Sequence, residues 1–319
     1  LILGGRYTYD ELEYDTSADK TDNLIFPPAG DFSDSLDDSD ISPKIAIQWD
    51  MNDDAMVYAS YVGGYKGPAF DTSLIAGGSY VKPETSDAWE TGFKSRWLDN
   101  RLIVNFAAFY AKYKNFQAQA SVDDPDDLLP ASLVLVNAGK VSTQGIELEV
   151  IAQPSVDWMI TGGVAYTDAT IDDYPEGNCS GGQKYRGECP LGFQNLSGGQ
   201  LPYTPKWKLN LSTNYTIQLD DLPFNVVFGG NLRSQDDVLY GLSQDENTKQ
   251  EAYTIVDIRA TLAGTRDGYR VTAFVKNIFD TNYASLIYAN SEVLLPNGYI
   301  QYVPKYANRT AGIEVRYDF

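Results

Sequence analysis

The chain has 319 residues, with 24 lysines and arginines against 44 aspartates and glutamates, so its formal net charge is -20. Such an acidic protein repels a phosphate backbone, which excludes nucleic acid as a partner. Histidine is absent, so imidazole-dependent chemistry, such as histidine-activated serine catalysis or haem ligation, is excluded within this sequence.

Apolar and polar residues alternate along the whole chain, a pattern typical of strands with one dry and one wet face. Aromatic residues reach 13%, which also favours strands. We predict about twelve strands, each near the ~10 residues with which a β-strand crosses a membrane. In chain order they are residues 4–15, 42–51, 55–66, 86–98, 101–116, 143–151, 156–168, 206–219, 223–235, 253–264, 268–276 and 309–319.

The connections between these strands alternate in length. Short polar turns are expected at 51–55, 98–101, 153–157, 219–223 and 265–268, and long loops at 15–41, 67–83, 118–137, 170–204, 236–250 and 279–307. Every long loop then lies at the same end of an up-and-down meander, as in bacterial outer-membrane barrels. The sequence therefore predicts an all-β, transmembrane, antiparallel up-and-down β-barrel.

The spacing of two tryptophans fits this prediction. Trp89 and Trp97 lie on one face of one strand, eight residues apart. With a rise of ~3.3 Å per residue and a tilt of ~40°, they are ~20 Å apart along the membrane normal, close to the ~25 Å apolar band between aromatic girdles. The alternative, a soluble all-β protein, would leave a very wide core to fill.

Several stretches resemble the C-terminal half of the barrel of TonB-dependent outer-membrane receptors. They are "VYASYVGGYKGPAFD" (57–71), "VKPETSDAWETGFKSRWLDNRLIVNFAAFYAKYKNFQ" (81–117), "VNAGKVSTQGIELEV" (136–150), "LPYTPKWKLN" (201–210), "FVKNIFDTNY" (274–283) and the closing "GIEVRYDF". The resemblance implies a 22-stranded barrel with a plug domain inside it. Residues 1–319 would form one N-terminally incomplete domain holding the last twelve strands, because neither the plug nor a TonB box is recognised.

The same resemblance implies the partners. They are the TonB–ExbB–ExbD complex, reached through the missing N-terminal part, the plug domain, and the lipid and lipopolysaccharide of a Gram-negative outer membrane. The terminal aromatic residue, Phe319, resembles the signal read by the outer-membrane assembly machinery.

The expected function is active import of a scarce nutrient, with a ferric siderophore as the default cargo. Two alternatives remain open: a TonB-dependent importer of carbohydrate or peptide, and a passive twelve-stranded pore. No nucleophile stands beside a base, so we expect neither enzyme activity nor a cofactor.

In the family, extracellular loops and the upper lumen bind the cargo, often with aromatic and basic groups. An anionic chelate needs cationic partners. The positions that match are Tyr65, Lys66, Tyr185, Arg186, Arg233, Tyr240, Tyr283, Tyr288 and Tyr302. For each of them, packing in a girdle or loop is the alternative role.

Two further features lie in the long loops. Cys179 and Cys189 flank a polar, Gly-rich stretch and are predicted to form a disulfide, with two free thiols as the alternative. The acidic runs at 31–40 and 123–127 lack the spacing of an EF-hand, so we expect exposed acidic loops and no metal site.

Overall fold

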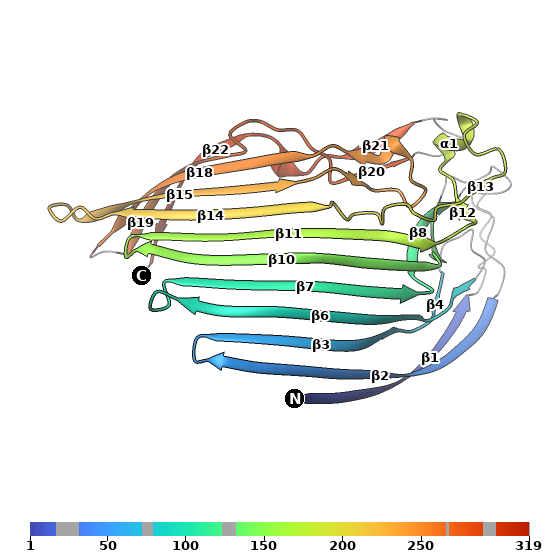
Figure 1. Ribbon diagram of the computed structural model, residues 1–319. Helices are drawn as coiled ribbons and strands as arrows, with labels where there is room; N and C mark the ends of the chain where they lie inside the picture. The colour runs from blue at the N-terminus through green and yellow to red at the C-terminus, as the bar shows by residue number, and fades with distance from the viewer. Residues whose placement is uncertain (17–31, 72–78, 123–131, 266–267, 290–297, 319) are drawn as a thin grey trace.

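The computed structural model describes residues 1–16, 32–71, 79–122, 132–265, 268–289 and 298–318. Twelve strands in this part form one antiparallel sheet in which they follow each other in chain order (Figure 1). They are β1 (Ile2–Thr16), β2 (Phe32–Asn52), β3 (Ala55–Lys66), β6 (Glu84–Trp97), β7 (Leu102–Lys114), β10 (Lys140–Ser155), β11 (Trp158–Asp173), β14 (Trp207–Ile217), β15 (Phe224–Gln235), β18 (Tyr253–Gly264), β19 (Tyr269–Lys276) and β22 (Thr310–Tyr317). The predicted number and order of strands are confirmed.

The two ends of the sheet differ (Figure 1). Tight turns join the strands at one end, which we term the turn end; in the β6–β7 turn, Leu98, Asp99 and Asn100 all have positive φ. The other end, termed the loop end, carries the long connections. Their short elements are β4 (Ala69–Phe70), β5 (Tyr80–Val81), β8 (Gln117–Val122), β9 (Ser132–Asn137), β12 (Gly177–Asn178), α1 (Gly181–Tyr185), β13 (Phe193–Gln194), β16 (Val238–Leu239), β17 (Lys249–Gln250), β20 (Leu286–Ala289), β21 (Tyr299–Tyr302) and 3-10 turns at Glu246–Thr248 and Lys305–Ala307.

Alternation along each strand gives the sheet two chemically distinct faces, since successive side chains of a strand point to opposite sides. In β14, Asn210 lies opposite Gly163 of β11 and Arg233 of β15, whereas Leu211 lies opposite Gly162 and Leu232. Polar side chains of neighbouring strands therefore lie on one side of the sheet and apolar side chains on the other. We refer to these sides as the polar face and the apolar face.

Aromatic residues on the apolar face gather at two levels. Near the loop end, Trp89 lies between Tyr61 and Tyr110, with ring centroids 5.4 and 5.8 Å away. Near the turn end, the rings of Trp158 and Tyr215 pack edge to face, with their centroids 6.3 Å apart. These two belts border the band of apolar side chains, as girdles do in membrane barrels.

One sequence prediction about the loops is wrong. The acidic run at 31–40 was expected in a loop, but from Phe32 onward it belongs to β2, where it pairs with β1 as far as Thr16. Charge indicates exposure to water and does not decide backbone conformation, and here Leu36 lies opposite Leu12 within the ladder.

Two other predictions concern residues outside the described part of the chain. They are the acidic run at 123–127 and the role of Phe319. Within the residues that the structure does describe, no group of three or more acidic or cysteine side chains is arranged to hold a metal ion.

A buried hydrophobic cluster lies at the loop end. Ala120, Ala138, Ile171, Leu196 and Leu242 form it; Ile171 belongs to β11, and the other four come from three different connections. The loops therefore pack on one another and on the top of the wall, and this packing shapes the spaces described next.

Candidate functional site

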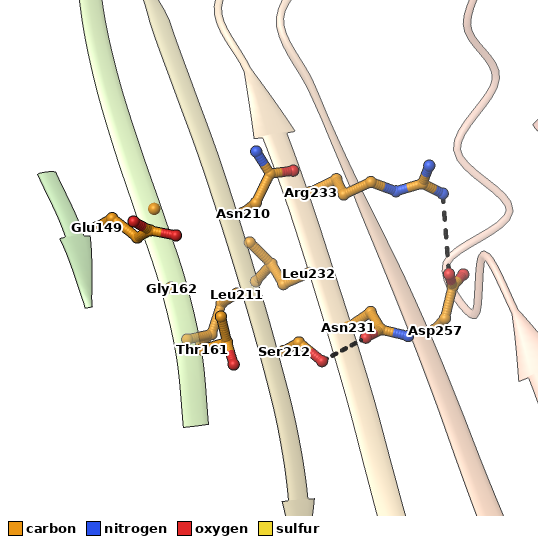
Figure 2. Close-up of a pocket in the computed structure, with 11 residues that line it drawn as sticks. Glu149, Thr161, Gly162, Asn210, Leu211, Ser212, Asn231, Leu232, Arg233 and Asp257 are labelled. Carbon is orange, nitrogen blue, oxygen red and sulfur yellow. Dashed lines mark hydrogen bonds and ion pairs between the residues drawn. The ribbon is translucent and has the colours of Figure 1, made fainter. Parts of the chain in front are cut away.

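The polar face has a concave space of about 580 Å³ across β10, β11, β14, β15 and β18 (Figure 2). Its polar lining consists of Glu149, Thr161, Asn210, Ser212, Asn231, Arg233 and Asp257. Ser212 and Asn231 lie within hydrogen-bond distance, at 2.8 Å. The space presents hydrogen-bonding groups from five adjacent strands.

Arg233 is the cation of this space. One of its guanidinium nitrogens is 3.8 Å from a carboxylate oxygen of Asp257, and 60% of the Arg233 side chain is exposed. At that distance and exposure the ion pair is weak. The guanidinium therefore remains accessible to an anion on the polar face.

A second space of about 190 Å³ adjoins the first toward the loop end. The two share Asn210 and Arg233, and the second adds Lys208, Tyr253 and Tyr283. The rings of Tyr253 and Tyr283 are stacked, with centroids 4.4 Å apart. We term this space the basic groove, since two cations lie there beside stacked aromatic rings.

A third space, of about 650 Å³, lies among the loops, and we term it the loop cavity. Two tyrosine pairs line it: Tyr203 with Tyr240, whose ring centroids are 5.3 Å apart, and Tyr288 with Tyr302, at 6.0 Å. The Tyr240 hydroxyl donates to the Ala284 carbonyl at 2.8 Å. Burial, together with the neighbouring tyrosines, raises the pKa of Tyr240 to about 12, so Tyr240 is uncharged at neutral pH.

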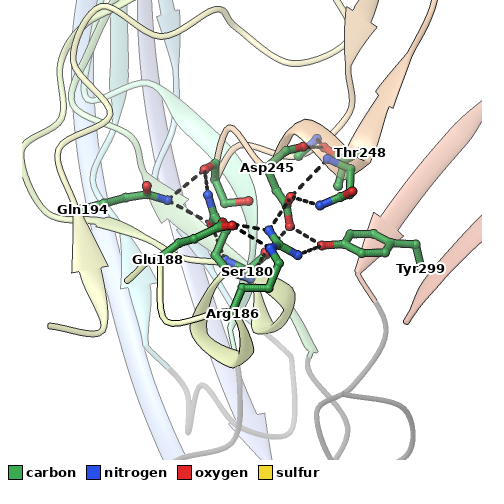
Figure 3. A network of polar contacts seen from close by, with 11 residues as sticks. Ser180, Arg186, Glu188, Gln194, Asp245, Thr248 and Tyr299 are labelled. Carbon is green, nitrogen blue, oxygen red and sulfur yellow. Dashed lines mark hydrogen bonds and ion pairs between the residues drawn. The ribbon is translucent and has the colours of Figure 1, made fainter. Parts of the chain in front are cut away.

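A polar network beside the loop cavity centres on Asp245 (Figure 3). Its carboxylate, which is fully buried, accepts hydrogen bonds from Ser180 at 2.5 Å, Tyr299 at 2.7 Å and Arg186 at 3.0 Å. Arg186 also donates to both carboxylate oxygens of Glu188, at 2.7 and 2.9 Å. Three loops meet at this one carboxylate.

The network shifts the acidity of its members. Burial alone would raise the pKa of Asp245, but the hydrogen bonds from Ser180, Tyr299 and Asn247 outweigh it, so the pKa lies below its ordinary value. The hydrogen bond from Arg186 likewise lowers the pKa of Glu188. Both carboxylates are therefore charged at neutral pH.

The structure joins Cys179 and Cys189 by a disulfide, the pairing that the sequence predicts, with Cα atoms 6.4 Å apart. Helix α1 lies between the two cysteines, and Ser180 caps it: its side chain accepts from the backbone N–H of Gln183, whose side chain accepts from the N–H of Ser180. The bridge and the cap hold this loop in one conformation.

The predicted ligand residues fall into four groups, two of which line a space described above. Tyr240, Tyr288 and Tyr302 line the loop cavity, and Arg233 and Tyr283 line the basic groove.

Arg186 lies in the Asp245 network, where its guanidinium already has partners. The other three predicted residues, Tyr65, Lys66 and Tyr185, do not line any of the three spaces. Tyr65 donates to Asp38 at 2.8 Å, Lys66 is opposite Glu84 at the end of β3, and Tyr185 is exposed on α1.

Sequence reasoning missed other lining residues. Lys208 has a detectable signal, because it alternates with apolar residues at the loop end of a predicted strand. Tyr203 precedes one predicted strand and Tyr253 begins another, so both could be found in the same way. Asp245 has no such signal, since its partners are far away in the sequence.

A family model described as "TonB dependent receptor-like, beta-barrel" matches residues 1–278. The chain belongs to this family. Membership places the strands of this TonB-dependent receptor barrel in the outer membrane of a Gram-negative bacterium, with the apolar face toward lipid and the polar face toward the lumen. No helix in the described part of the chain is long and apolar enough to cross a membrane.

Curated relatives of the chain include siderophore receptors. The ferripyoverdine receptor of Pseudomonas aeruginosa is 26% identical over 248 residues, which cover 76% of this chain and 27% of that receptor. The probable TonB-dependent siderophore receptor PiuA of Acinetobacter baumannii is 25% identical over 259 residues, which cover 78% of this chain and 31% of that receptor. The matches thus span under a third of these relatives.

Solved structures share the fold. The ferric yersiniabactin uptake receptor FyuA of Yersinia pestis superimposes with a TM-score of 0.73 at 21% identity, covering 99% of this chain and 43% of that one. The predicted fold, part of a TonB-dependent receptor barrel without a plug among the described residues, is confirmed.

Proposed function

We propose that the chain is the C-terminal part of the barrel of a TonB-dependent transporter that actively imports a ferric siderophore. The observation that carries the proposal is the basic groove. Lys208 and Arg233 are exposed there beside stacked Tyr253 and Tyr283, in a chain whose net charge is -20.

The groove suits an anionic iron chelate. Siderophores bind iron through negatively charged oxygens, and a guanidinium and an ammonium form charge-assisted hydrogen bonds with such groups. Aromatic faces add stacking and cation–π contacts. The names of the curated relatives, which include ferric-pyoverdine receptors, support the same cargo class.

In this proposal the three spaces act in sequence from outside to inside. The loop cavity would meet the cargo first, the basic groove would hold it, and the 580 Å³ space would offer polar contacts further down the lumen. The shared residues Asn210 and Arg233 make the last two continuous.

The rest of the proposal concerns the whole receptor. One domain, incomplete at its N-terminus, would be completed by further barrel strands to 22 and by a plug. A TonB box would engage TonB–ExbB–ExbD, lipopolysaccharide would surround the loop end, and Phe319 would serve in assembly. Family membership supports these assignments.

Transport suits this site better than the other functions considered. A carbohydrate importer would use the tyrosines but would leave the paired cations Lys208 and Arg233 without a role. A passive pore needs no binding groove. An enzyme needs a nucleophile beside a base; Ser180 does lie beside Asp245, but Ser180 caps α1 and Asp245 joins three loops, so both have structural roles.

Uptake of a radiolabelled ferric siderophore by cells that express the receptor tests the proposal. Uptake should cease when a protonophore collapses the proton gradient. It should fall about tenfold in Arg233→Gln, the loss of roughly one charge-assisted hydrogen bond. Arg96→Gln at the turn end is the matched control. Uptake that persists without the proton gradient would support the pore instead.

A further inference from the structure

A further concave space lies on the apolar face of the sheet, and the proposed function gives it no role. It has a volume of about 750 Å³ and extends across β11, β14, β15, β18 and β19, which are neighbours in the sheet. Tyr215 of β14, Phe228 of β15 and Ala260 of β18 line it and lie opposite one another in the ladders. We term this space the apolar groove.

Small residues form the floor of the apolar groove. Gly230, Ala260 and Ala273 lie on the three neighbouring strands β15, β18 and β19. Arg259 also lines the groove, but alternation directs its side chain to the polar face, where the guanidinium donates to Asn214. Only the backbone of Arg259 therefore reaches the groove, and the floor consists of backbone and methyl groups.

Larger side chains line the rest of the groove. They are Trp158, Tyr215 and Phe228 on β11, β14 and β15, and Ile258 and Val275 on β18 and β19. Nε1 of Trp158 donates to the Thr213 hydroxyl at 2.9 Å, which fixes the indole ring. Because this N–H already has an acceptor, the walls offer a ligand mainly apolar contacts.

Hydrocarbon surrounds the groove, since the apolar face of this receptor barrel points toward lipid,. A flat stretch of that face contacts a lipid chain on one side only, whereas the groove contacts it with its floor and its walls. Each additional pair of atoms in contact adds dispersion energy, and an unfilled space forfeits it. A lipid chain in the groove would therefore be held more tightly than one elsewhere on the same face.

The turns beside the groove are acidic. Asp157, in the β10–β11 turn, directly precedes the wall residue Trp158, and the exposed Asp220 and Asp221 lie in the β14–β15 turn. Neither turn contains lysine or arginine, and the β18–β19 turn contains one residue of each sign. Carboxylates attract an ammonium group and repel an anion. A lipid headgroup with an ammonium group is therefore favoured over one with a net negative charge.

We propose that the apolar groove binds one acyl chain of a membrane phospholipid whose headgroup carries an ammonium group, as in phosphatidylethanolamine. The chain lies on the floor formed by Gly230, Ala260 and Ala273, and the headgroup lies near Asp220 and Asp221. The inference goes beyond the proposed function, because it concerns the opposite face of the sheet and holds for any cargo. Failure of siderophore uptake would leave it standing, and an empty groove would leave the cargo class standing.

Occupancy is tested by filling the groove. Native mass spectrometry of the intact receptor, released from vesicles of phosphatidylethanolamine and phosphatidylglycerol, counts the lipids that remain bound. Ala260→Phe should lose the phospholipid that the wild type retains. Ala59→Phe is the matched control, because Ala59 is exposed on the apolar face of β3, opposite Ile47 and away from the groove, and it should retain that lipid.

Equal lipid retention in these two variants would overturn the proposal, and so would a second receptor copy that replaces the lipid. Heat-modifiable mobility on gels reports whether each variant forms a barrel. Ala273→Phe, on the neighbouring strand of the floor, repeats the test if Ala260→Phe does not form one.

The headgroup preference is tested with two tryptophans of the apolar face near the turn end. Trp158 lines the groove, whereas Trp97 is exposed outside it, with Nε1 donating to the Ser95 hydroxyl at 2.8 Å. Bromine atoms on a lipid chain quench tryptophan fluorescence on contact. The fluorescence lost in Trp158→Phe and in Trp97→Phe isolates the contribution of each tryptophan.

In vesicles where brominated phosphatidylethanolamine is diluted with unbrominated phosphatidylglycerol, Trp158 should be quenched at a lower brominated fraction than Trp97. Replacing Asp220 and Asp221 together by Asn should remove this difference. Replacing Asp53 and Asp99, exposed in two other turns, should preserve it. Equal quenching of the two tryptophans in the wild type, or a difference that survives the change at Asp220 and Asp221, would overturn the proposal.

Discussion

The wall and the loops of this receptor barrel are held together in different ways. In the wall, backbone ladders join neighbouring strands, such as the continuous register from Ala55 opposite Ser95 to Lys66 opposite Glu84. At the loop end, side chains join segments that are far apart: Ser180 and Asp245 are separated by 65 positions, and Arg186 and Tyr299 by 113. A single substitution can therefore loosen the loops while the wall stays intact.

The substitution with the largest expected effect should destabilise the loops and leave the wall unchanged. Asp245→Ala should destabilise the joined loops by about 3–5 kcal/mol, the usual cost of removing one partner of a buried ion pair. Hydrogen exchange of residues 180–186 should accelerate accordingly, while exchange of β14 stays slow. Glu246→Ala is the control and should change neither. Acceleration in both regions would show that wall and loops are one cooperative unit.

Lowering the pH should weaken the same contacts of Asp245. The folded pKa of Asp245 is lowered, so its contribution is fully present above the unfolded value near 3.9 and is lost as pH falls through the folded pKa. Glu188 changes in the same direction. We expect constant loop protection from pH 7 to about 5 and loss below about 4. Loss of protection near pH 6 would contradict this assignment.

In the wall, the two faces can be tested at neighbouring positions. Leu211 is on the apolar face and Ser212 on the polar face of β14. Leu211→Arg should cost about 2–4 kcal/mol of folding free energy in lipid vesicles, because a charge then faces hydrocarbon. Ser212→Arg should cost little. Equal costs would mean that the two faces are wrongly assigned.

A smaller, more local effect is expected from the disulfide. Cys179 and Cys189 are ten positions apart, and closing so short a loop stabilises by about 2–3 kcal/mol. Cys179→Ser should speed hydrogen exchange in α1 and leave the thermal unfolding of the barrel unchanged. A lower unfolding temperature of the barrel would show that the loops support the wall.

The sequence predicts the wall well because the causes are local. Alternation in β14 and the polar turn at 98–101 each act within a few residues, so strand number, order and face follow from them. The acidic part of β2 was missed because charge suppresses the strand signal, although its pairing with β1 continues.

The loops could be predicted only in part. Tyrosines near strand ends were recognisable, and three of them line the loop cavity. The role of Asp245 depends on Ser180, Arg186 and Tyr299, and no short-range pattern connects these residues. Gln117 gives no signal either, because its side chain meets the carbonyls of Gly67 and Lys82 only in the folded chain.

In the proposed function the basic groove holds the ferric centre of the cargo. Anomalous diffraction at the iron edge, from crystals of the receptor with a ferric siderophore that it imports, locates that centre directly. We expect an iron peak on the polar face beside Lys208, Arg233 and Tyr283. A peak beside β1–β3, away from those residues, would contradict it.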